Sequence, residues 1–188
     1  MSYLLGADLA RMGQDSSCYI IIEEGNDDNP HKVVFCKEVA KNTMDQAIDY
    51  ILFLHNKFKF KKIICDSTGL GAGVVDVLAK QLNTPKDKSQ HNYSQKYVSH
   101  DIVVGLTFTV RTKEDIFSNL KLLMEQGQLK IPDHKKLIFQ LKDFRYETTP
   151  AGNIKLHHSE GGHDDLVDAL ACAAHGLRST KNSAFFFG

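Results

Sequence analysis

The sequence predicts a single α/β domain with a mixed five-stranded sheet flanked by helices and an extra β-hairpin. Three apolar runs with short connections occupy the first forty residues, a pattern typical of an antiparallel meander. Short buried strands then alternate with helical periodicity, which favours parallel strands joined by right-handed crossovers. Near the end, Pro150-Ala151-Gly152 separates two short segments of β character and predicts the hairpin.

The meander strands are expected at residues 3–8, 18–23 and 32–39. A helix should follow, because Thr43 and Gln46 have capping-box spacing. Its inward face is predicted to contain Ala47, Ile48, Ile51, Leu52, His55 and Phe58. Strands four and five should add to the first strand in parallel.

The remaining elements follow the same logic. Strands are predicted at 62–65 and 102–109, helices at 113–126, 134–144 and 163–177, and hairpin strands at 145–149 and 153–157. The glycine-rich segment Gly69–Gly73 should lead into a further helix that carries Val74, Val75, Leu78 and Leu82. The inward face of the 113–126 helix should contain Ile116, Leu120, Leu123 and Met124. Residues 83–99 are polar and predict a surface loop.

Composition places the chain among globular domains. It has 188 residues, of which 42% are hydrophobic and 24% charged, so one domain over residues 1–178 with a frayed tail at 179–188 is expected. Lysine plus arginine equals aspartate plus glutamate at 23 each, so binding to nucleic acid would need a local basic patch. No membrane-length apolar run or signal peptide is visible, and the four scattered cysteines predict free buried thiols.

Acidic residues stand where predicted strands end and where the last helix begins. Asp8 ends the first strand and Asp66 the fourth, and the ends of parallel strands form the ligand crevice of an α/β sheet. Asp164, Asp165 and Asp168 open the last helix. Crowded carboxylates repel unless a divalent cation neutralises them, and oxygen ligands suit magnesium or manganese. Together these acids predict a metal site.

Each feature also has a simpler interpretation. An aspartate at a strand end can be a turn former, and Asp164 can be a helix cap. The segment Ser67–Gly73 could cradle a phosphate, but it lacks the lysine of a P-loop, so a tight strand-to-helix turn is favoured. His157, His158 and His163 lack partners at zinc spacing, and His163 better fits a position near a metal-bound water or a phosphate.

Five segments together resemble the nuclease domain of the large terminase subunit of tailed bacteriophages. They occur in order over nearly the whole chain and are Gly6–Ala10, Gly13–Ser17, Ile64–Gly69, Gly127–Pro132 and Gly162–Leu170. The H-D-D-x-x-D-A-L block combined with the two upstream acids is the most specific part. The resemblance implies a ribonuclease H-like fold, related to Holliday-junction resolvases of the RuvC type.

The resemblance also implies an activity, namely a metal-dependent endonuclease that cuts concatemeric viral DNA during genome packaging. It assigns catalytic roles to Asp8, Asp66 and Asp165, with two Mg²⁺ or Mn²⁺ ions as cofactors. Asp164 and Asp168 are further metal-ligand candidates, and the resolvase-like D-x-x-D-A-L spacing makes Asp168 a competitor of Asp165. His163 and Asp15 are auxiliary candidates.

Partners are implied in the same way. Full-length large terminases carry an ATPase motor domain, but this chain has no Walker motif. Double-stranded DNA, such a motor, the small terminase subunit and the portal are the expected partners, and the cytoplasm of the infected bacterial host is the expected location. The alternatives are a RuvC-like junction resolvase, a non-catalytic actin-like nucleotide-binding module, and a structural domain whose acids are caps.

Basic residues near the predicted acidic site are candidates for DNA contact. Arg145 and Lys155 lie on the hairpin, and Lys86, Lys88 and Lys96 lie in the polar loop. We expect them to contact phosphates without reading bases.

Overall fold

The computed structural model describes residues 1–9, 16–26, 28–69, 71–83, 101–148, 154–157 and 164–177. Within these residues, one six-stranded sheet has the order β5-β4-β1-β2-β3-β6. Its strands are β1 (Tyr3–Asp8), β2 (Ser16–Glu23), β3 (His31–Ala40), β4 (Lys62–Asp66), β5 (Val103–Leu106) and β6 (Leu129–Lys130). The strands β7 (Arg145–Thr148) and β8 (Ile154–His157) pair separately as the predicted hairpin.

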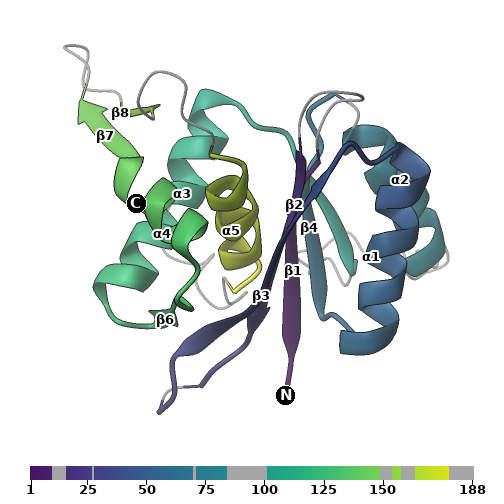
Figure 1. Ribbon diagram of the computed structural model, residues 1–188, viewed down its shortest axis with the longest axis horizontal. Helices are drawn as coiled ribbons and strands as arrows, with labels where there is room; N and C mark the ends of the chain where they lie inside the picture. The colour runs from purple at the N-terminus through teal and green to yellow at the C-terminus, as the bar shows by residue number, and fades with distance from the viewer. Residues whose placement is uncertain are drawn as a thin grey trace, which may run out of the picture.

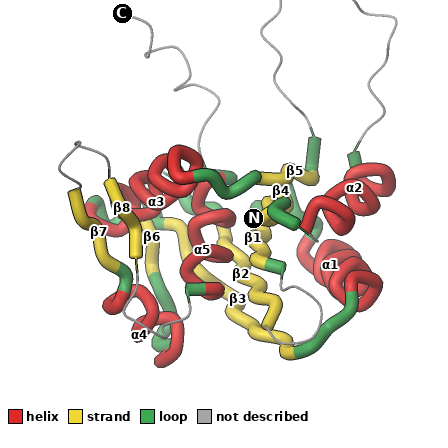
Figure 2. Tube along the Cα trace, turned by 90° about the horizontal axis from the view of Figure 1, so that it is seen from above, coloured by secondary structure: helices red, strands yellow, loops and turns green. Residues whose placement is uncertain are grey.

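Helices cover both faces of the sheet. On one face lie α1 (Met44–Phe58) and α2 (Gly71–Leu82), and on the other lie α3 (Val110–Glu125), α4 (Lys135–Asp143) and α5 (Asp165–His175), as Figures 1 and 2 show. Each face has its own apolar core, because alternate residues of a strand point to opposite sides. In β2, for example, Ile20 and Ile22 belong to the core beneath α5, whereas Tyr19 and Ile21 belong to the core beneath α1.

The predicted strand directions are confirmed. Strand β1 is antiparallel to β2 and β2 to β3, whereas β4 is parallel to β1 and β5 is parallel to β4. The predicted number of five strands was too small, because β6 adds a sixth strand parallel to β3. Two residues give too short a pattern for a strand to be recognised from sequence.

Capping residues explain where two helices begin. Thr43 and Gln46 form the predicted capping box of α1, whose buried face includes Leu54 in addition to the predicted positions at Ala47, Ile48 and Ile51. Helix α3 begins at Val110, earlier than predicted, because its own capping box starts at Thr109. The fifth strand therefore ends at Leu106, since the residues after it lead into the cap. Met124, predicted to point inward near the end of α3, is exposed.

The segment between β4 and α2 contains a tight turn, as favoured from the sequence. Gly69 has a positive φ of 65°, a conformation that glycine adopts without strain. A Cβ on Gly71 would overlap the backbone oxygen of Asp66. Both glycines thus have a backbone reason for their presence.

Helix α5 packs unusually close to β1. A Cβ on Gly6 would overlap the backbone oxygen of Ala169 and the backbone nitrogen of Ala173, so only glycine fits between the strand and the helix. At the other end of the helix, Gly176 lies against the side chain of Leu4. Helix α5 therefore runs antiparallel to β1, and its first turn lies beside the carboxyl end of that strand.

Some predictions fall outside the described residues, namely most of the 83–99 loop and the 179–188 tail. The four cysteines are unpaired, and three of them are buried, which confirms the prediction of free thiols. Among the described helices, none is both long and apolar enough to span a membrane.

The close approach of α5 to Gly6 predicts a large loss of stability for Gly6→Ala. The new methyl group would meet backbone atoms, which can move only if the whole helix shifts, so we expect a loss of about 3 kcal/mol, or roughly 6–12 °C in Tm for a chain of this size. Thermal unfolding followed by circular dichroism measures the change.

Gly73→Ala is the matched control. A Cβ at Gly73 would meet only the flexible Met44 side chain, and alanine favours a helix, so the Tm should stay the same or rise. If the Tm fell by the same amount in both variants, the result would contradict the close packing of α5 against β1.

Candidate metal centre

Asp8 and Asp66 lie side by side at the carboxyl ends of adjacent parallel strands. Ala7 of β1 pairs with Cys65 of β4, so the two aspartates follow the last paired residues on neighbouring strands. Ala7 and Cys65 belong to the core beneath α1 and α2. Because side chains alternate along a strand, Asp8 and Asp66 point to the opposite side, where α5 begins.

Helix α5 brings the other three carboxylates to the same edge of the sheet. Asp164 is the N-cap residue of α5, and Asp165 and Asp168 lie in its first turn. Asp168 is the most buried of the five acids, with 6% of its surface exposed, whereas the others are half-buried. The acids predicted from the sequence are thus brought to one place by two strand ends and one helix start.

The crowded carboxylates perturb one another. The pKa of Asp8 is raised from its ordinary value of 3.8 to about 8, first by burial and then by the charges of Asp168, Asp165 and Asp66. Burial likewise raises the pKa of Asp168 to about 7, although the nearby Lys113 opposes that rise. Asp8 is therefore the carboxylate on which the repulsion of the cluster converges.

Lys113 of α3 partly neutralises this cluster, a role that the sequence analysis missed. Its Nζ atom donates to Oδ2 of Asp168 at 2.9 Å and to Oδ1 at 3.3 Å, and it lies 3.8 Å from Oδ2 of Asp164. The same ammonium lies 5.1 Å from the ring centre of Phe108 and 6.0 Å from that of Phe117, within the range of cation–π attraction. Burial alone would lower the pKa of Lys113, but the attraction of Asp168 outweighs it and raises the pKa.

A signal for Lys113 is present in the sequence. Ile116, Phe117 and Leu120 form the buried face of α3. Lys113 precedes them by three, four and seven residues, which places it on the same face of the helix. A lysine on an apolar face needs a partner for its charge, so this position predicts a nearby carboxylate.

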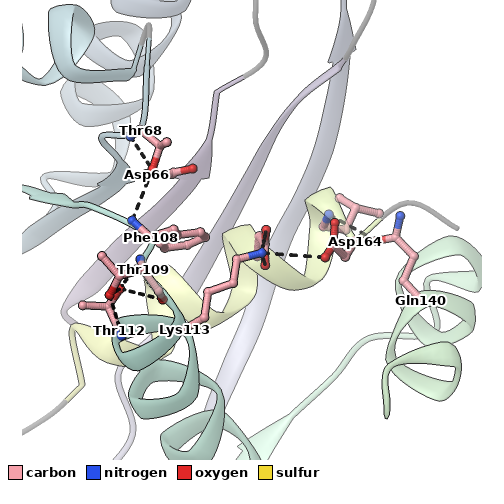
Figure 3. Close-up of polar contacts among 10 residues, drawn as sticks. Asp66, Thr68, Phe108, Thr109, Thr112, Lys113, Gln140 and Asp164 are labelled. Atoms are coloured by element: carbon pink, nitrogen blue, oxygen red, sulfur yellow. Dashed lines mark hydrogen bonds and ion pairs between the residues drawn. The ribbon is translucent and has the colours of Figure 1, made fainter. Parts of the chain in front are cut away.

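Gln140 of α4 is a second residue that the sequence analysis missed. It is buried, and its side-chain oxygen accepts a hydrogen bond from the backbone N–H of Leu166 in the first turn of α5 (3.1 Å). Asp164 makes no capping hydrogen bond through its side chain, so the interpretation of Asp164 as a simple helix cap was wrong. Figure 3 shows Lys113, Asp164 and Gln140 around the start of α5.

Asp66 is held by the turn that follows β4. Its Oδ1 atom accepts a hydrogen bond from the backbone N–H of Thr68 at 2.8 Å, and the Thr68 hydroxyl accepts one from the backbone N–H of Phe108 at 3.2 Å (Figure 3). These bonds connect the end of β4 to the segment that leads into α3. The positions of Asp66 and Lys113 are therefore coupled through the same loop.

The donor set fits a divalent cation in its chemistry and charge. Carboxylate oxygens are the ligands preferred by magnesium and manganese, and a cation would relieve the repulsion that raises the pKa of Asp8. As the described side chains are placed, no three acidic, histidine or cysteine residues lie close enough to hold one ion. Asp66 and Asp168 are instead turned toward Thr68 and Lys113.

Other predicted site residues cannot be placed in this arrangement. Asp15, His163, Lys86, Lys88 and Lys96 lie outside the described residues. Arg145 and Lys155 lie on the paired strands β7 and β8. Strand β8 contacts α3, the helix that carries Lys113.

Comparison with known proteins agrees with this geometry. The family described as "Terminase RNaseH-like domain" matches residues 5–176. The large terminase subunits of Thermus virus P23-45 and Thermus phage G20c are 29% and 30% identical over 91% of this chain. The chain spans 31% of the length of each of these relatives.

A solved structure shows the same fold. The large terminase nuclease from thermophilic phage G20c with bound magnesium superimposes with a TM-score of 0.70 at 25% identity. The match covers 93% of this chain and 80% of that chain.

The ion pair between Lys113 and Asp168 predicts a loss of stability for Lys113→Met. Methionine retains an apolar side chain of similar length but leaves the buried carboxylate without its cation. We expect a loss of about 2 kcal/mol at pH 7, or roughly 4–8 °C in Tm, measured by thermal unfolding in chelator.

Lys121→Met serves as the matched control on the same helix. The Nζ atom of Lys121 lies 3.8 Å from Glu125 and both side chains are exposed, so its removal should change the Tm little. If both variants unfolded at the wild-type temperature, Lys113 would not be neutralising the cluster.

The raised pKa of Asp8 predicts a pH-dependent stability. Between about pH 4 and pH 8 the folded protein keeps a proton on Asp8 that the unfolded chain releases, so this group makes the protein less stable as the pH rises. Asp8→Asn, which cannot ionise, should therefore unfold at a higher temperature than the wild type at pH 8 and at a similar temperature at pH 4.5, both in chelator. A rise of about 2–4 °C at pH 8, corresponding to about 1 kcal/mol, is expected. Equal Tm values at pH 8 would show that Asp8 is not under this repulsion.

Proposed function

Because the chain belongs to the terminase RNase H-like domain family, we propose that it is the metal-dependent endonuclease domain that cuts concatemeric viral DNA during genome packaging. The observation that carries this proposal is the convergence of Asp8, Asp66 and the acidic start of α5 at one edge of the sheet. Carboxylate oxygens are the ligands that magnesium prefers, and divalent ions held in this way can catalyse phosphodiester hydrolysis.

Asp8, Asp66 and Asp165 are the proposed ligands of two magnesium or manganese ions, with Asp164 and Asp168 beside them. When bound, such ions lower the pKa of an attacking water and stabilise the leaving 3′ oxygen. Asp8 is the best candidate to bind both ions, because the charges of Asp66, Asp165 and Asp168 all raise its pKa. His163 and Asp15 remain proposed auxiliary residues.

Lys113 has a supporting role in this proposal. Its ammonium offsets the charge of Asp168 and Asp164, which lowers the repulsion that a DNA phosphate would meet at this edge. The ammonium is held by hydrogen bonds to Asp168 and by two aromatic rings, so its charge has a fixed position. A fixed charge stabilises a reacting group without first having to reorganise.

The proposed substrate is double-stranded DNA. Arg145 and Lys155 on the hairpin and Lys86, Lys88 and Lys96 are proposed to contact its phosphates, which would give sequence-tolerant and salt-sensitive binding. An ATPase motor domain, the small terminase subunit and the portal are the proposed partners, in the cytoplasm of the infected bacterial host. The relatives' greater length is consistent with a motor domain in the same polypeptide.

Plasmid cleavage by Asp8→Asn tests the proposal. Asparagine keeps the shape of the side chain but removes its charge, so cleavage in magnesium or manganese should fall at least about 100-fold, or about 2.7 kcal/mol in the barrier. The rise in Tm caused by these ions should disappear as well. Agarose gels and thermal unfolding, each with and without chelator, measure the two effects.

Asp49→Asn, an exposed position on α1, is the charge-matched control and should cut like the wild type. If Asp8→Asn cleaved plasmid at the rate of the wild type, the assignment of the site would be wrong. Cutting restricted to four-way junctions would favour the resolvase alternative. Stabilisation by ATP without cleavage would favour the nucleotide-binding alternative.

A further inference from the structure

The start of α5 is capped in an unusual way. An aspartate at the N-cap position ordinarily accepts a hydrogen bond from the backbone N–H two or three residues later. Asp164 occupies this position but makes no such bond. Its carboxylate lies instead 3.8 Å from the ammonium of Lys113.

Gln140 takes the place of the missing cap. Its Oε1 atom accepts a hydrogen bond from the backbone N–H of Leu166 at 3.1 Å, in a buried environment. Leu166 stands two residues after Asp164, so this is one of the N–H groups that Asp164 would otherwise cap. A buried N–H without an acceptor is costly, and an N-cap aspartate is an ordinary acceptor for this N–H. Removal of the glutamine oxygen would therefore favour a turn of the Asp164 carboxylate toward Leu166.

Gln140 is itself held firmly. It lies on α4, whose first turn is capped by His134 through a hydrogen bond from the N–H of Leu137 (3.2 Å). At the other end of α4, Phe144 stacks on Phe117 of α3, with the ring centres 4.4 Å apart. The acceptor for the Leu166 N–H is thus held in place by a separate helix, so this N–H is satisfied without the carboxylate of Asp164.

We propose that Gln140 is a positioning residue of the acidic centre. It satisfies the first turn of α5 and so keeps the carboxylate of Asp164 directed toward Lys113 and the other acids. The consequence for metal binding rests on the proposed function, whereas the capping exchange between Gln140 and Asp164 does not.

A double-mutant cycle in chelator tests the capping exchange. Gln140→Met has a similar length and no acceptor, and Asp164→Ala can neither cap nor ligate. In the wild-type background Gln140→Met should lower the Tm by less than about 2 °C, because Asp164 takes over the cap. In the Asp164→Ala background it should lower the Tm by roughly 2–4 °C more than that, since a helix cap is lost outright.

Calorimetric titration with magnesium tests the consequence. Gln140→Met should weaken magnesium binding about 3- to 10-fold in the wild-type background, since Asp164 is drawn away. It should not weaken binding further once Asp164 is alanine.

The outcomes distinguish the two proposals. Equal Tm losses from Gln140→Met in both backgrounds would overturn the positioning role. The role would also be overturned if the wild type bound magnesium and Gln140→Met bound it with the same affinity. A wild type that binds no magnesium would count against the proposed function, while the thermal cycle would still decide the role of Gln140.

Discussion

The close contact between α5 and β1 is the constraint on which the rest of the structure depends. Gly6 provides the space for this contact, and the alanines of α5 supply a surface small enough to use it. Because the helix runs antiparallel to the strand, its acidic first turn must lie beside the strand end that carries Asp8. That contact brings the carboxylates of the strands and of the helix close enough for their charges to raise the pKa of Asp8. A packing feature in the core thus determines the chemistry at the edge of the sheet.

That contact brings several carboxylates close together, and the surrounding helices offset part of the repulsion between them. Buried carboxylates repel one another, which raises the pKa of Asp8 and Asp168. Helix α3 contributes a cation through Lys113, and α4 contributes a neutral acceptor through Gln140. Neither helix carries one of the clustered acids, yet both determine how those acids are oriented. The three helices on this face of the sheet therefore act as one unit around the candidate site.

The sequence predicted what depends on local patterns. Strand directions, the capping box at Thr43, the hairpin and the acids at the strand ends all follow from periodicity and spacing between neighbours in the chain. It did not predict β6, which has two residues and exists because β3 offers a free edge. Nor did it predict Lys113 or Gln140, whose partners lie 55 and 26 residues away in the chain. Long-range polar contacts leave a weak local signal, which for Lys113 is a charge on an apolar helix face.

The acids of the cluster differ in exposure and in bonding partners, and these differences indicate different roles. Asp168 is nearly buried and bonded to Lys113, whereas Asp8, Asp66 and Asp165 are half-buried. Magnesium usually retains several of its waters, so it favours carboxylates that water can reach. The half-buried acids, Asp164 among them, meet this requirement better than Asp168 does, and the three proposed ligands belong to this group. In this arrangement Asp168 contributes by holding Lys113 in place, so that the most buried acid of the cluster fixes the position of its neutralising cation.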